Sequence, residues 1–363
     1  PPGFINFWLS PQTLCAELQK ILKEKSKYGS SKVGKGRKIQ VEFVSANPTG
    51  PLTLANGRGG FLGDVISNVL DKTGHKVERE YYVNDTGNQI LTFGKSILAL
   101  AGLILSEEHF YKGEYLKEWA ENHKSLITKH KTKPLVLGQI AARDFLKAIK
   151  NVLKKKARIR FDRWTSEEQH IRKKKLERKA LAMIERKGLA YEKDGAIWFK
   201  TTEFRDDKDR VLIKRDGSPT YILPDAGHYL ETRLRGFGGK VLILGPDHYG
   251  YIKRIQAAAQ VVGLKNLQIL ITQALRLVSG GKEIKMSKRR GEFVSFEELV
   301  REVGSDASRF FMLMVAPETH MDFDLKLAKE RSLKNPVYYS QYALVRAASI
   351  LRKISKKKII LKT

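Results

Sequence analysis

The pattern of hydrophobic and polar residues predicts an α/β chain. Two stretches, 38–44 (KIQVEFV) and 241–244 (VLIL), are typical of strands buried in a parallel sheet. Each runs into a turn that contains glycine and proline, and helical periodicity follows at 59–72 and 251–262. A strand, a glycine- and proline-rich turn and a helix form the opening of a nucleotide-binding α/β unit. We therefore expect a Rossmann-like domain built on a parallel sheet.

The remaining pattern divides into helices, strands and hairpins. Periodicity predicts an amphipathic helix at 11–27, a mostly helical and highly charged segment at about 91–190, and a helix from about 335 onward. Two more buried strands are expected at 77–83 and 267–272. Asp-Gly and Gly-Gly turns predict three hairpins, at 191–199, 211–223 and 275–285.

Composition adds a large positive charge to this picture. The 363 residues include 68 Lys and Arg against 39 Asp and Glu, which gives a formal net charge of +29. A protein this basic usually binds a polyanion, most often nucleic acid. The densest basic runs, at 154–156 and 172–175, could contact a phosphate backbone or form solvated helix faces.

Several classes of protein are excluded or disfavoured by the same composition. The single cysteine, Cys15, rules out an internal disulfide framework and a cysteine-cluster metal site. No apolar run approaches the roughly 18 residues of a membrane span, and the first residues do not resemble a signal peptide. We therefore expect no membrane partner and a cytoplasmic location.

Two segments carry the candidate chemistry. P-loop and Gly-x-Gly-x-x-Gly fingerprints are absent, so a phosphate site must be built in another way. In 47–59 (NPTGPLTLANGRG), small residues allow close approach of a nucleotide, and a helix N-terminus offers free N–H groups. In 285–291 (KMSKRRG), four cations in six positions suit a phosphate clamp. The alternatives are an ordinary strand-to-helix turn and a solvated basic loop.

Together, in this order and separation, the two segments resemble the HIGH and KMSKS signatures of class I aminoacyl-tRNA synthetases. More specifically, the chain resembles arginyl-tRNA synthetase in seven collinear segments that span nearly its whole length. These are 41–60, 81–90, 111–120, 201–225, 245–252, 285–300 and 335–343.

The resemblance implies a division of the chain into three parts. Residues 35–330 would form the Rossmann-like catalytic domain, with the helical insertion at about 91–190. Residues 1–34 would be the remnant of an N-terminal tRNA-contacting domain with a linker helix. Residues 331–363 would be the incomplete start of a helical anticodon-binding domain.

The implied activity has two steps. ATP activates L-arginine to arginyl-adenylate, and the arginyl group then passes to the 3′ end of tRNA(Arg). ATP would enter with Mg²⁺, and we expect no tightly bound cofactor, no protein metal site and a monomer. Two alternatives stay open, a synthetase-like paralogue without charging activity and a nonenzymatic RNA-binding protein.

The resemblance also implies an ATP site. Lys285 and Lys288 would supply cations to the β- and γ-phosphates. Thr53 and Asn56 stand where the family has two histidines, and their hydroxyl and amide groups can also donate hydrogen bonds. These four residues are the implied catalytic set. The implied ATP-binding set is Gly50, Pro51, Thr53, Asn56, Gly57, Gly245, Asp247, Met286, Ser287 and Lys288.

The implied arginine site rests on a carboxylate. A planar guanidinium pairs best with a carboxylate, and Asp225 and Tyr221 match the family's pocket. Other interpretations are a helix N-cap for Asp225, a solvent-exposed strand-edge charge for Glu42, a turn cap for Asp85 and a packed strand-end residue for His248. The implied arginine-binding set is Glu42, Asn47, Asp85, Tyr221, Asp225 and His248.

Overall fold

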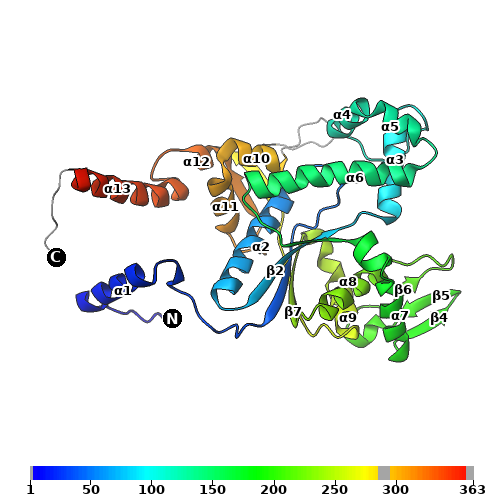
Figure 1. Ribbon diagram of the computed structural model, residues 1–363, viewed down its shortest axis with the longest axis horizontal. Coiled ribbons are helices and arrows are strands. Elements are labelled where there is room, and N and C mark those ends of the chain that lie inside the picture. The colour runs from blue at the N-terminus through cyan, green and yellow to red at the C-terminus, as the bar shows by residue number, and fades with distance from the viewer. Residues whose placement is uncertain (1–2, 285–294, 357–363) are drawn as a thin grey trace.

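The computed structural model describes residues 3–284 and 295–356, and its centre is a five-stranded parallel sheet (Figure 1). The strand order is β3-β2-β1-β7-β8, so the chain moves outward from β1 to β3 and then returns to β7 beside β1. The order therefore reverses between β1 and β7. The strands are β1 (Lys38–Glu42), β2 (Lys76–Val83), β3 (Arg163–Ser166), β7 (Gly239–Leu244) and β8 (Asn266–Ile271).

The two faces of the sheet bury different side chains. On one face Val41, Phe43 and Tyr81 belong to a hydrophobic core that also includes Phe61 of α2 (Leu54–Lys72). On the other face Leu242 packs in a second core with α8 (Ile222–Leu234) and α9 (Ile252–Val261). The predicted α/β class and the four strands predicted for the parallel sheet are confirmed, although β8 is mostly half-buried or exposed.

A group of helices lies between β2 and β3 and has its own core, which includes Phe93, Leu116 and Leu137. Its two longest helices approach closely at Gly94 and Gly138. A Cβ on Gly94 would lie 1.8 Å from the carbonyl oxygen of Pro134, so no larger residue fits there. The helices are α3 (Gly87–Leu100), α4 (Glu114–Asn122), α5 (Lys124–Lys129) and α6 (Pro134–Asn151), followed by the short η2 (Val152–Lys156).

The predicted helical segment at about 91–190 also contains strand β3, which the sequence pattern did not reveal. This strand has four residues, Arg163 to Ser166, at the edge of the sheet and lacks an apolar run. After β3 the chain forms η3 (Glu167–Arg172) and α7 (Leu176–Arg186).

A small antiparallel sheet follows, with the order β4-β5-β6. The hairpin predicted at 191–199 is confirmed as β4 (Ala190–Lys193) and β5 (Ala196–Phe199). The turn expected near Asp216 also forms, but the return arm of that hairpin is a single bridge from Ile213 to Pro219, because α8 begins at Ile222. The other elements here are η4 (Thr201–Phe204) and β6 (Arg210–Ile213).

The C-terminal part packs against α2. The guanidinium of Arg58, which is 1% exposed, donates hydrogen bonds to the carbonyls of Gln273, Ala316 and Thr319 at 2.8–3.0 Å. These bonds join α2 to the loops around a third sheet, which has the strand order β10-β9-β11. The hairpin predicted at 275–285 is confirmed as β9 and β10 of this sheet. The elements are β9 (Leu275–Ser279), β10 (Lys282–Glu283), β11 (Met321–Asp324), α10 (Phe296–Val303), α11 (Ser305–Leu313) and α12 (Leu325–Lys329).

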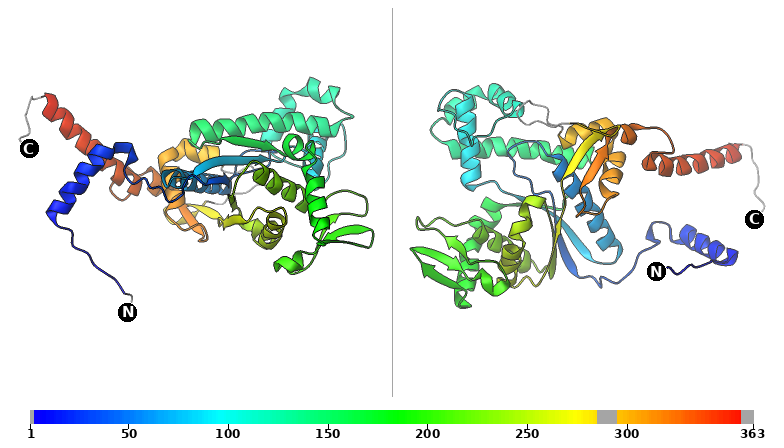
Figure 2. Two further views of the ribbon diagram at one scale, coloured as in Figure 1. Left: turned by 60° about the horizontal axis from the view of Figure 1, so that its bottom comes forward. Right: turned by 180° about the vertical axis from the view of Figure 1, so that it is seen from behind.

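The first and last helices extend from the same side of the body, as both views of Figure 2 show. They are α1 (Pro11–Glu24), continued by η1 (Lys25–Lys27), and α13 (Pro336–Lys356). Helix α1 has no buried residue. Among the residues that the structure describes, no helix is long and apolar enough to cross a membrane.

Buried charges join the central strands to one another. Lys240, at the start of β7, is fully buried, and its ammonium lies 2.7 Å from a carboxylate oxygen of Glu42 on β1 and of Glu80 on β2. It also donates to Gln40 at 2.7 Å. Burial lowers the pKa of Lys240, but the two carboxylates outweigh this effect and raise the pKa above its ordinary value. The ion pairs thus hold three neighbouring strands together.

Replacing Lys240 with methionine tests the importance of these pairs. The variant keeps most of the side-chain volume but leaves two carboxylates buried without their cation, so the free energy of unfolding should fall by about 3–5 kcal/mol. The loss should shrink in mild acid, where the carboxyls can take up a proton. Chemical denaturation measures both effects, with the exposed Lys193→Met in β4 as the control. A loss no larger than that of the control would contradict this role.

Candidate active site

A cleft of about 1280 Å³ opens at the carboxyl ends of β1 and β7, where the strand order reverses. Ligands of open α/β sheets bind at this position because the loops diverge there. Most of the residues that the sequence assigned to ATP and arginine line this one cleft. They are Glu42, Asn47, Gly50, Pro51, Thr53, Asn56, Asp225, Gly245, Asp247 and His248.

The loop after β1 enters the cleft through a strained turn. Val44 and Ser45 have φ angles of 67° and 38°, in the left-handed region that β-branched residues rarely adopt. The Ser45 hydroxyl donates to Glu42 at 3.1 Å and accepts from the backbone N–H of Tyr82 at 3.0 Å. Such strain persists only where the surroundings enforce it, and it is concentrated at functional sites.

Thr53 and Asn56, which replace the two histidines, hydrogen-bond to each other. Thr53 is the N-cap of α2, and its hydroxyl accepts from the Asn56 backbone N–H at 3.2 Å. The Asn56 side-chain oxygen in turn accepts from the backbone N–H of Thr53 at 2.9 Å and from its hydroxyl at 2.8 Å. This capping box uses the Thr53 hydroxyl proton, whereas the Asn56 amide N–H groups make no hydrogen bond to another described residue.

Part of the expected ATP set lies elsewhere. Gly57 is not among the described residues that line the cleft. A Cβ there would lie 2.2 Å from the ring of Phe296, so this glycine allows α2 to pack on α10. The whole KMSKR segment falls outside the described ranges, and with it the four residues that the sequence assigned to ATP. They are Lys285, Met286, Ser287 and Lys288.

Asp225 lies on the cleft wall in the first turn of α8, whose N-cap is Tyr221. The interpretation of Asp225 as an N-cap is therefore wrong. Burial is the main cause that raises the pKa of Asp225 to about 7; nearby Glu167 and Glu42 raise it further, while His228 and Lys240 oppose the rise. This carboxyl has no matching cation of its own among the described residues, which suits a site for a cationic ligand.

Glu42 is not a solvent-exposed strand-edge charge, since it is only 6% exposed. One of its oxygens faces Lys240 at 2.7 Å but forms no hydrogen bond with good geometry to any described residue. Glu42 therefore lies between the buried ion pairs and the cleft, which it also lines.

The other three arginine-site candidates differ in position. His248 lines the cleft and lies 3.4 Å from the Asp247 carboxylate, so it is not packed in the core. Tyr221 is not among the described residues that line the cleft; it is 48% exposed and accepts a hydrogen bond from Arg254 at 2.7 Å. Asp85 lines a separate small cavity and accepts from the Ser166 hydroxyl at 2.5 Å and from the backbone N–H of Glu168 at 3.1 Å.

The sequence interpretation missed two polar residues that line the cleft, Tyr82 and His228, and the buried Glu80 behind them. Tyr82 lines the cleft, stacks on His228 at 4.3 Å between ring centroids, and has a buried hydroxyl without a hydrogen-bond partner among the described residues. His228 contacts Glu80, which is fully buried. The available signal was the presence of Glu80 and Tyr82 within a buried strand, where polar groups need partners.

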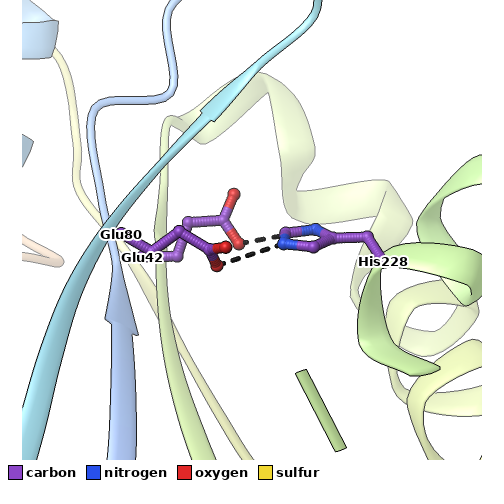
Figure 3. Close-up of side chains that lie close together, drawn as sticks. All are labelled: Glu42, Glu80 and His228. Carbon is purple, nitrogen blue, oxygen red and sulfur yellow. Dashed lines mark hydrogen bonds and ion pairs between the residues drawn. The ribbon is translucent and has the colours of Figure 1, made fainter. Parts of the chain in front are cut away.

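Glu42, Glu80 and His228 come together in the way that metal ligands do (Figure 3). The ammonium of Lys240 is already 2.7 Å from both carboxylates, so a second cation there would meet strong repulsion. Lys240 and His228 also hold the pKa of Glu80 well below its ordinary value against the opposing effect of burial. The cluster is therefore an ion-pair network rather than a metal site.

Comparison with known proteins agrees with this geometry. A model of the family described as tRNA synthetases class I (R), catalytic domain, matches residues 17–314. The arginine–tRNA ligase of Syntrophotalea carbinolica is 41% identical over 97% of this chain, and arginine–tRNA ligase 1 of Halalkalibacterium halodurans is 43% identical over 97%. The chain spans 65% of the length of each of these relatives.

Solved structures give the same result. A crystal structure described as an arginyl-tRNA synthetase from Campylobacter jejuni is 32% identical, with a TM-score of 0.86 over 96% of this chain and 78% of its own. The Thermus thermophilus arginyl-tRNA synthetase, at 20% identity and a TM-score of 0.68 over 92% of this chain and 68% of its own, shares the fold. The family match, the identities and the cleft at the reversal of strand order lead to one conclusion: the chain belongs to the arginyl-tRNA synthetase family of class I tRNA synthetases.

Proposed function

We propose that the cleft binds L-arginine and ATP, forms arginyl-adenylate and pyrophosphate, and transfers the arginyl group to the 3′ end of tRNA(Arg). The observation that carries this proposal is the partly buried carboxyl of Asp225, which has no paired cation among the described residues and lies in the same cleft as the N-terminus of α2. The Asp225 end of the cleft suits a guanidinium, and the end formed by the N-terminus of α2 suits phosphates.

Arginine would lie with its guanidinium at Asp225 and its amino-acid end near Glu42 and Asn47. A guanidinium is planar and always charged, so it can form two parallel hydrogen bonds to one carboxylate. Its charge would restore the ionised form of Asp225. The carboxylate of arginine would then point toward the α-phosphate of ATP for attack, and no nucleophile from the protein is needed.

ATP would enter as its magnesium complex, with the metal carried by the phosphates. The Asn56 amide and the free N–H groups at the start of α2 would donate to the triphosphate, and Gly245 and Asp247 would lie beside the adenosine. Lys285 and Lys288 are proposed from the sequence to supply cations. These groups stabilise charge and position reactants, which is the main requirement of this type of phosphoryl chemistry.

The formal charge of +29 supports a polyanionic partner, which we propose is tRNA(Arg). We also propose that the protein acts as a monomer in the cytoplasm, without a tightly bound cofactor, and that residues 1–34, 35–330 and 331–363 act as separate domains.

Arginine-dependent exchange of pyrophosphate into ATP tests the proposed function. We expect exchange with arginine and not with lysine, whose compact ammonium cannot form the two parallel bonds. The assay is run with and without tRNA(Arg), and activity in either condition supports the proposal. Absence of exchange in both conditions, together with retained RNA binding, would instead favour an RNA-binding protein or an inactive paralogue.

Asp225→Asn tests the arginine site. Below about pH 7 the free carboxyl holds a proton that guanidinium binding must release, so wild-type affinity for arginine should rise as pH rises toward neutrality. Calorimetry in two buffers should detect nearly one proton released at about pH 6 and almost none at about pH 8. The variant should release no proton on binding arginine at either pH, and it should bind arginine at least roughly 100-fold more weakly than the wild type.

Two further measurements make the Asp225 test specific. ATP affinity should stay nearly unchanged in Asp225→Asn, and Asp194→Asn in the β4–β5 turn serves as the control. The folded state holds the extra proton between the unfolded pKa and about 7, so wild-type stability falls as pH rises through this range, and the variant should lack that fall. Equal weakening of arginine and ATP binding would refute the assignment.

Thr53 and Asn56 can be separated by two substitutions. Asn56→Asp keeps the oxygen that accepts from the Thr53 backbone N–H and hydroxyl but replaces the amide donor with a negative charge, so stability should hold while exchange slows roughly 10- to 100-fold. Thr53→Ala removes the cap but keeps the amide, so the free energy of unfolding should fall by about 1 kcal/mol with a smaller loss of rate. The opposite pattern would assign the phosphate contact to Thr53.

A further inference from the structure

The helical insertion contacts the far wall of the cleft through a segment to which the proposed chemistry gives no role. Tyr115 lies in the first turn of α4, and its hydroxyl donates a hydrogen bond to the carbonyl oxygen of Thr49 at 3.1 Å. Its ring meets Phe145 of α6 edge to face, with centroids 5.6 Å apart, and so packs against the insertion's own core. Tyr115 therefore connects this core with the loop that follows β1.

Two glycines provide the space for this ring. A Cβ on Gly50 would lie 3.0 Å from the ring carbon that carries the hydroxyl and from the hydroxyl oxygen. A Cβ on Gly113 would lie 2.5 Å from another ring carbon. The ring thus packs directly on the backbone at Gly50, which belongs to the proposed ATP site.

The loop around Gly50 has few other attachments. Tyr81 holds its beginning by donating to the carbonyl of Ala46 at 2.7 Å, and the Phe296 backbone N–H holds its end by donating to Leu52 at 2.9 Å. Between these points, the bond from Tyr115 to Thr49 is the one hydrogen bond from another element found within the described ranges.

We propose that Tyr115 is a positioning residue for ATP, which fixes the backbone of residues 49–51 at the place where the nucleotide binds. Tyr111, Lys112 and Glu114, from the same segment as Tyr115, also line the cleft. The helical insertion is then part of the nucleotide site rather than a separate appendage. The inference rests on the proposed function, since it takes the loop to be the nucleotide-binding one.

Tyr115→Phe removes the hydroxyl and keeps the ring. The KM for ATP in pyrophosphate exchange should rise roughly three- to tenfold, the effect of one hydrogen bond, while the KM for arginine stays within about twofold. Tyr191→Phe is the matched control, because it also loses one hydroxyl bond, to Asp209 at 3.0 Å, in the small sheet away from the cleft. A purely structural role would lower the unfolding midpoint without separating the two KM values.

A rescue experiment tests the packing. Gly50→Ala presses a methyl group against the Tyr115 ring and should raise the KM for ATP, whereas in a Tyr115→Leu background the same change should have a clearly smaller effect. If Gly50→Ala raises the KM for ATP by the same factor in both backgrounds, the packing contact has no role in ATP binding. An unchanged KM for ATP in Tyr115→Phe would likewise contradict the proposal.

Failure of this inference can be distinguished from failure of the proposed function. If the wild type shows no arginine-dependent exchange, the proposed function fails, and ATP binding is then measured directly by calorimetry for wild type and Tyr115→Phe. Weaker ATP binding by the variant supports the role of the hydrogen bond from Tyr115 to Thr49. Equal binding, or no binding of ATP by the wild type, overturns it.

Discussion

The central sheet depends on one buried cation. The ammonium of Lys240 lies between Glu42 and Glu80, and so joins β7 to β1 and β2 where the strand order reverses. Burying charges costs several kcal/mol per ion unless their partners are well placed. Here the partners include the Gln40 amide oxygen at 2.7 Å and the Thr165 hydroxyl, which donates to Glu80 at 2.5 Å. The network fixes the floor of the cleft before any ligand binds.

The same network leaves the cleft floor with a shortage of positive charge. Lys240 compensates Glu42 and Glu80, and Arg172 pairs with Glu167 at 2.7 Å, but Asp225 has no such partner among the described residues. Burial is the main cause that raises the pKa of Asp225 to about 7, and the nearby carboxylates of Glu167 and Glu42 raise it further. A cationic side chain entering from the cleft would supply the missing charge, so one electrostatic feature links the stability of the sheet to selectivity for arginine.

Local sequence was enough to predict β1, β2, β7 and β8. Strand β7 contains a continuous apolar run that ends at Gly245, whereas β2 carries Glu78, Arg79 and Glu80 and could be predicted from its apolar and aromatic residues and the turn-rich loop that follows. It was not enough for β3, whose four polar and aromatic residues become a strand only by pairing with β2. The partners of Lys240 and the burial of Glu42 depend on which strands become neighbours. The capping box of Thr53 and Asn56 has spacing visible in the sequence, yet the resemblance to the histidine signature directed attention to phosphate binding instead.

We propose that Asp225 is the site at which the cleft receives the guanidinium of arginine. A crystal structure of this chain with L-arginine would show whether it does. We expect the guanidinium to form two hydrogen bonds with the Asp225 carboxylate and the amino-acid end to point toward Glu42 and Asn47. Arginine bound outside the cleft, or with its guanidinium away from Asp225, would refute this assignment.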